Sequence, residues 1–123
     1  AMDAYRRAWD KVWTDFRNRL PEQHLKFYQN LQHYYVTGDY LFVHAGLRPG
    51  ESLENQTVRD MLWIREEFLD AEEQFPQVVV HGHTPTDGVF RDDRRIGLDT
   101  GAFISGKLSA VRLFRDEVSF LST

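Results

Sequence analysis

The sequence predicts an α+β protein in which helices come first and strands are concentrated in the later part. The first 33 of its 123 residues place apolar side chains at helical spacing, whereas the rest contains short β-branched and aromatic runs. Two of these runs lead directly into histidine and glycine. The length suits one compact domain or part of a larger one. We therefore divide the chain into a helical segment, residues 1–33, and a β-rich segment, residues 34–123.

The helical segment carries apolar residues three and four positions apart, as on one face of a helix. They are Tyr5, Trp9, Val12, Trp13, Phe16 and Leu20. Pro21 ends this helix, and its fixed φ suits the first position of a second, shorter helix that includes residues 25–31. We therefore expect two consecutive helices.

The β-rich segment begins with a hairpin. Residues 34–36 and 40–43 flank Thr37-Gly38-Asp39, a turn sequence between two apolar arms. The second arm is apolar throughout, which is typical of a strand covered on both faces. Residues 78–80, all valine, predict another buried strand. We expect a broken helical region over 53–73 and further strands at 96–98, 108–114 and 118–121.

Composition narrows the classes of function. The net charge of −4 provides no basic field for a nucleic-acid backbone. The absence of cysteine excludes disulfides and thiolate metal sites. No run approaches the roughly 20 apolar residues that span a bilayer, and the start lacks a secretory signal pattern. We therefore expect a cytoplasmic protein without nucleic-acid or membrane partners.

The ends of two buried runs carry the candidate functional residues. The first run continues into His44, and the second into His81, Gly82 and His83. Glycine lets the backbone approach closely, and imidazole is the commonest neutral metal ligand. Two histidines cannot hold a metal tightly without other ligands. On these residues alone, histidines satisfied at strand ends explain the pattern better than a metal site does.

Four ordered stretches favour the metal site: YLFVHAGLRPG, LWIREEFL, VVVHGHTP, and IGLDTGA followed by GKLSAVRLF. From about residue 34 to residue 114 they resemble the C-terminal half of bacterial serine/threonine phosphoprotein-phosphatase-like (calcineurin-like) metallophosphoesterases. The resemblance implies half of a β-sandwich flanked by helices, incomplete without its N-terminal half. Residues 1–123 would then be the C-terminal portion of such a domain.

The resemblance also implies roles for individual residues. His44 and His83 match the two histidines that bind the second metal of a dinuclear centre. Arg65 matches the arginine that binds the substrate phosphate, and a planar guanidinium suits two phosphate oxygens. His81 matches a variable position, which we place behind the metal ligands or facing the substrate. Asp99 fits a structural hydrogen-bond acceptor better than a ligand.

The implied cofactor is a divalent metal. We expect Mn²⁺, with Fe, Zn or Ni as alternatives, because such sites accept several metals. In the complete domain two metals hold a bridging hydroxide that attacks the phosphoester. The motifs GDxHG, GDxxDRG and GNHE, which supply the other ligands and the general acid in that family, are absent here. We therefore expect at most one partial site, and little or no activity from this chain alone.

The predicted parent activity is hydrolysis of phosphate monoesters, with a phosphorylated protein or a small phosphoester as substrate. Two alternatives stay open: a nucleotide phosphoesterase such as a dinucleoside tetraphosphate hydrolase, and a non-catalytic interaction module that keeps the fold. Half of a sandwich exposes strand edges and apolar faces. We therefore expect its partner to be the missing N-terminal half or a second copy of the chain.

Overall fold

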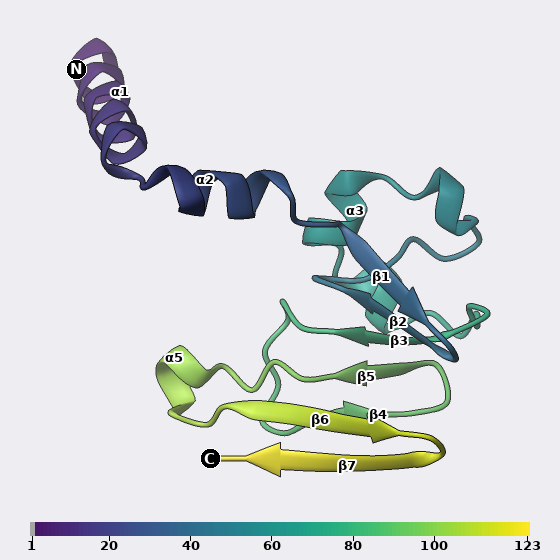
Figure 1. Ribbon diagram of the computed structural model, residues 1–123. Coiled ribbons are helices and arrows are strands. Elements are labelled where there is room, and N and C mark those ends of the chain that lie inside the picture. Colours follow the sequence, from purple (N-terminus) through teal and green to yellow (C-terminus); the bar gives the residue numbers. More distant parts are fainter. Residues whose placement is uncertain (1) are drawn as a thin grey trace. The chain divides into compact units, whose positions relative to one another are not determined.

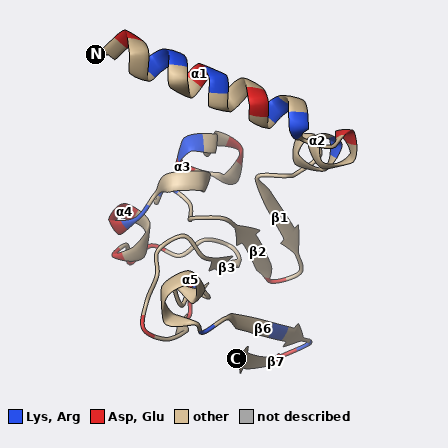
Figure 2. Cartoon of the chain, turned by 90° about the vertical axis from the view of Figure 1, so that its left-hand side faces the viewer, with Lys and Arg blue, Asp and Glu red and all other residues tan. Residues whose placement is uncertain are grey.

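The computed structural model describes residues 2–123, which separate into two compact units after Gln32 (Figure 1). The first unit contains helices α1 (Met2–Arg19) and α2 (Glu22–Gln29), as predicted. Pro21 is the residue before α2, one position earlier than expected, and its φ is −58°. Charged and uncharged residues alternate along α1 (Figure 2). Neither helix contains a buried residue.

The second unit is built on a five-stranded sheet with the strand order β1-β2-β3-β5-β4. The strands are β1 (Tyr34–Thr37), β2 (Tyr40–Val43), β3 (Val78–His81), β4 (Phe90–Arg91) and β5 (Arg95–Gly97). The central strands β2, β3 and β5 are parallel, and the two edge strands run antiparallel to their neighbours. The predicted hairpin is therefore confirmed as β1 and β2, and the predicted valine strand as β3.

The region between β2 and β3 is broken into short helices, as predicted. They are the 3₁₀ helix η1 (Leu53–Asn55), α3 (Val58–Trp63) and α4 (Glu66–Leu69). The Thr57 hydroxyl caps α3 by accepting a hydrogen bond of 3.0 Å from the Asp60 amide. Buried side chains from α3 and α4 pack on one face of the sheet, which we call the helix face. The core there comprises Leu41, Val43, Ala45, Leu47, Met61, Ile64, Phe68 and Val79.

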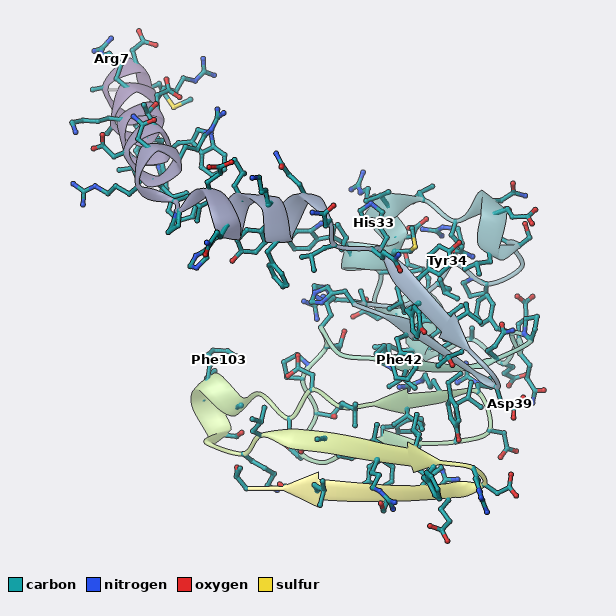
Figure 3. All side chains as sticks on the ribbon, viewed as in Figure 1. Arg7, His33, Tyr34, Asp39, Phe42 and Phe103 are labelled. Carbon is teal, nitrogen blue, oxygen red and sulfur yellow. The ribbon has the colours of Figure 1, made fainter. Side chains whose placement is uncertain are left out.

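The chain ends in a separate two-stranded sheet formed by β6 (Ser109–Phe114) and β7 (Glu117–Ser122). The sequence predicted both strands to within one residue at each end. It missed β4 and the helix α5 (Ala102–Ser105), because two and four residues are too short for a periodic pattern. Phe103 projects outward from α5 and is 85% exposed (Figure 3).

One prediction about β2 was wrong. Leu41 and Val43 are buried on the helix face, but Tyr40 and Phe42, which point to the other face, are only half-buried. Although β2 is apolar throughout, residues 2–123 therefore cover only one of its two faces fully. Within those residues, no helix is both long and apolar enough to cross a membrane.

Candidate metal and phosphate site

The candidate site lies where the parallel strands end. His44 follows β2, the loop 82–86 follows β3, and Asp99 lies just beyond β5. The carboxyl ends of parallel strands meet at one edge of a sheet, where α/β proteins commonly bind ligands. The Gly82 amide donates to the His44 carbonyl at 2.9 Å, and the Leu98 amide donates to the His81 carbonyl at 2.9 Å. These bonds join three loops that are far apart in the sequence.

His44 and His83 come together at this edge. Their ring centroids are 5.0 Å apart, and the ring planes are inclined by 58°. His83 adopts a left-handed backbone conformation with a φ of 67°. Such a conformation is uncommon outside glycine, and unusual backbone geometry is concentrated at functional sites. The structure therefore brings the two predicted metal ligands side by side, within reach of one ion.

The ring of His83 has a nitrogen without a partner. Its Nε2 atom is buried and forms no hydrogen bond within residues 2–123. A buried polar atom that makes no bond costs free energy, and it calls for an explanation such as an ion or a water molecule. On the other side, Trp63 meets His83 edge to face, with ring centroids 5.6 Å apart. An imidazole nitrogen held in this way is suited to a metal ion.

The charge state of His83 also favours a metal. Burial lowers the pKa of His83 below its ordinary value, and the positive charge of Arg65 and the neighbouring His44 lower it further. The Trp63 backbone and the Asp99 carboxylate oppose this shift without cancelling it. A lowered pKa keeps the imidazole neutral, which is the form that binds metal.

Arg65 lies beside the same loop. It precedes α4, and its Nη1 donates to the Thr84 hydroxyl at 3.2 Å. No ion pair of Arg65 occurs within the part of the chain that the structure describes. The guanidinium is half-buried and close enough to His83 to influence its pKa. Its charge is therefore available to an anion such as a phosphate group.

The loop after His44 is braced against α3 and α4. Arg48 binds the Asp60 carboxylate with two hydrogen bonds, of 2.9 Å from Nε and 2.6 Å from Nη2. The Ala45 amide donates to the Met61 carbonyl at 2.9 Å. Gly46 lies against the Phe68 ring so closely that a Cβ atom would be 2.3 Å from Cδ1. Trp63 is the last residue of α3 and Arg65 lies between α3 and α4, so this bracing fixes His44 relative to both.

His81, the third histidine of the candidate site, lies in the core of the protein. It is buried in the core, where its ring meets Phe68 edge to face at 5.1 Å. Arg95 Nη1 lies 3.1 Å from Nε2, and the Gly82 carbonyl lies 3.1 Å from Nδ1. Because arginine only donates, the neutral ring must accept at Nε2 and carry its proton on Nδ1. Burial lowers the pKa of His81 to about 4. His81 is therefore a side chain of the core, and a role behind the metal ligands stays a prediction.

Asp99 stabilises the loop that carries His83. Its Oδ1 accepts from the Gly101 amide at 2.9 Å, and its carbonyl accepts from the Thr86 amide at 2.9 Å. Both contacts fit the expected structural acceptor. Thr84 and Trp63 are also close to the site, although neither was predicted from the sequence to belong to it. Their signal was proximity in the sequence, since Thr84 follows His83 and Trp63 lies two residues before Arg65.

The described residues supply only part of a metal centre. Within residues 2–123, no group of three or more histidine, aspartate, glutamate or cysteine side chains is arranged to hold a metal. The donor set is therefore two imidazoles, completed by water or by ligands from elsewhere. A divalent metal that binds histidine fits this pair, and the unpaired nitrogen of His83 is the observation that supports the fit.

No protein-family model matches the chain, and no curated protein matches it. Among solved structures, the chain is similar to a protein provisionally described as a diadenosine tetraphosphatase, with a TM-score of 0.71 and 19% sequence identity. The fold is metallophosphoesterase-like. The match covers 92% of this chain, which spans 60% of the length of the other. At this identity the likeness shows the fold alone.

Proposed function

We propose that the chain contributes part of the site of a metal-dependent phosphoesterase. In this proposal His44 and His83 hold a divalent metal, and Arg65 binds the phosphate of the substrate. The observation that carries it is the buried, unpaired Nε2 atom of His83, in a ring 5.0 Å from that of His44. The similarity to a phosphatase-like fold supports it independently.

Each residue has a distinct task in this site. His44 and His83 each present a ring nitrogen, and burial lowers the pKa of His83 and so keeps that ring neutral. Thr84 holds the Arg65 guanidinium by a side-chain hydrogen bond, so that its remaining N–H groups are aimed at an anion. When bound, a divalent metal supplies Lewis acidity to the phosphoryl oxygens. Mn²⁺ is the proposed ion, with Fe, Zn and Ni as alternatives.

Two substrate classes follow from different observations. The sequence motifs favour a phosphorylated serine or threonine in a protein, whereas the described activity of the structural neighbour favours a dinucleoside tetraphosphate. Both substrates present phosphoryl groups to the same guanidinium. A competition binding experiment separates the two classes, because it compares the affinities of a phosphoserine peptide and of diadenosine tetraphosphate for the site that contains Arg65. Tighter binding of the nucleotide, lost in Arg65→Ala, would favour the nucleotide class.

Metal binding is the direct test of the site. We expect isothermal titration of the chain with Mn²⁺ to give about one ion per chain, because one histidine pair supports one ion. His44→Ala and His83→Ala should each lower the affinity at least about tenfold, the scale of losing one ligand from an incomplete site. His24→Ala, at an exposed histidine in α2, is the matched control. Equal affinity in all four proteins would refute the site.

Catalysis is tested separately. Because the described residues provide no carboxylate cluster to complete a second metal, we propose that the chain alone turns over no phosphate monoester. Hydrolysis of p-nitrophenyl phosphate by the purified chain, abolished by His44→Ala, would contradict that proposal while supporting the metal site. Metal and phosphate binding without turnover also fits a module that keeps the fold without catalysis.

A further inference from the structure

Arg95 is a charged side chain buried in the core without a carboxylate in contact. It lies on β5 and is 9% exposed, and within residues 2–123 no salt bridge joins its guanidinium to an acidic group. Its Nε atom is buried without a hydrogen-bond partner, and its Cζ atom lies 3.9 Å from the centroid of the Phe90 ring. Burying an unbalanced cation is costly, and an apolar side chain often fills such a place at least as well. The arginine therefore has a reason other than packing to be there.

The guanidinium of Arg95 fixes the proton of the His81 ring. Nη1 lies 3.1 Å from His81 Nε2, so Nε2 accepts and the ring carries its proton on Nδ1. Nδ1 then donates to the Gly82 carbonyl oxygen at 3.1 Å. A neutral imidazole without such a neighbour can carry its proton on either nitrogen. Arg95 therefore selects the tautomer of His81 that bonds to Gly82.

The Gly82 carbonyl is the base of a strained turn. It also accepts a hydrogen bond of 2.8 Å from the Thr84 amide, which closes a three-residue γ-turn around His83. The φ of His83 is 67°, and a γ-turn with a positive φ at its central residue is the rare, strained form. Such backbone persists only where the surrounding structure holds it. The His81 ring holds the carbonyl of Gly82, and the His44 carbonyl holds its amide at 2.9 Å.

We infer that Arg95 is a positioning residue of the candidate site, which acts through His81 to hold the turn at His83 in its strained form. Without the guanidinium the turn would lose the bond from the His81 ring, and the His83 ring would be held less firmly beside His44. The inference rests on the proposed function, because it takes His83 as a metal ligand. It goes beyond that function by assigning the placement of His83 to a residue on another strand.

Arg95→Met tests the inference, because methionine keeps an unbranched apolar chain and removes every donor. We expect Mn²⁺ binding in isothermal titration to weaken at least about tenfold, the scale of losing an outer partner of a ligating histidine. Stability in urea should change little, since the variant also removes an unbalanced buried charge. Arg94→Met is the matched control. Arg94 likewise bonds to the Leu69 carbonyl but not to His81, so this variant should bind Mn²⁺ as the wild type does.

A double-mutant cycle tests whether Arg95 acts through His81. His81→Phe keeps an aromatic ring against Phe68 and removes both ring nitrogens. In that background Arg95→Met should cause no further loss of Mn²⁺ affinity. The inference is overturned by a full further loss in that background, by wild-type affinity in Arg95→Met, or by an equal loss in Arg94→Met.

Two measurements need no metal. In the wild type, ¹⁵N NMR should find the His81 proton on Nδ1, and a proton on Nε2 would overturn the inference even if Arg95→Met did not fold. Hydrogen exchange at the Thr84 amide should quicken about fivefold in Arg95→Met, the scale of one lost hydrogen bond, but not in Arg94→Met. Unchanged exchange in Arg95→Met would also overturn the inference. A wild type that binds no Mn²⁺ would instead refute the proposed function, so the two failures are distinguishable.

Discussion

The amide of Gly82 donates a hydrogen bond of 2.9 Å to the carbonyl oxygen of His44. This bond links the loop after β2 to the loop after β3, although the two residues are far apart in the sequence. It continues the pairing of the two parallel strands one step beyond their ends. His83 follows directly, and its left-handed backbone turns the imidazole toward His44. The histidine pair is therefore a product of strand pairing.

Gly46→Ala should destabilise the fold. The added methyl group would lie 2.3 Å from Cδ1 of Phe68, and Phe68 is 1% exposed and cannot easily move. We expect a loss of about 1–3 kcal/mol in the free energy of unfolding, the usual cost of overpacking a core. Urea denaturation measures it. Gly88→Ala, where a methyl group meets nothing within 4 Å, is the matched control. Adding Phe68→Leu should recover part of the loss.

Thr84→Val should weaken phosphate binding without changing the fold. Valine has the shape of threonine but cannot accept the hydrogen bond from Arg65 Nη1. Losing one such bond costs about 1 kcal/mol, or about fivefold in affinity. Titration with inorganic phosphate in the presence of Mn²⁺ measures the effect, and Thr84→Ser should restore wild-type affinity. If serine and valine behaved alike, the hydroxyl would have no role in holding Arg65.

The buried imidazole of His81 should make stability depend on pH. Its pKa is about 4 in the fold, against an ordinary value of 6.5, because burial disfavours the charged ring. Between pH 6.5 and about pH 4, His81 is protonated in the unfolded chain but stays neutral in the folded chain. The free energy of unfolding should therefore fall as pH is lowered through this window, with a contribution of about 3 kcal/mol from His81.

His81→Gln removes the titrating ring and should flatten this part of the pH profile of stability. The exposed residue His24 provides the control, because His24→Gln should leave the slope as it is. Chemical denaturation at several pH values between 4 and 7 measures all three proteins. A slope that is the same in His81→Gln and in the wild type would assign the pH dependence to other groups.

Mn²⁺ should raise the melting temperature through His83. A ligand that binds only the folded state stabilises it by about 2.7 kcal/mol at a concentration 100 times its dissociation constant. We expect the increase in the wild type and its loss in His83→Ala, because that substitution removes the unpaired buried Nε2 atom. Mg²⁺, which prefers oxygen ligands, should have a smaller effect. Equal shifts with and without His83 would exclude it as a ligand.

Local sequence patterns were sufficient to predict most of the elements. Helical spacing located α1, and short apolar runs bounded by turn residues located β2 and β3. These patterns work because each element places its apolar side chains with its own period. The patterns failed for β4 and α5, which are too short to show a period.

The sequence by itself predicted which residues would carry the chemistry: the order of its motifs picked out His44, Arg65 and His83. Only the tertiary structure decided that the two histidines lie side by side, that Arg65 is bonded to the residue after His83, and that His81 lies in the core. The physical reason is that side chains alternate along a strand, so the sequence alone shows which face of the sheet each residue lies on. What lies against that face depends on how distant segments pair and pack.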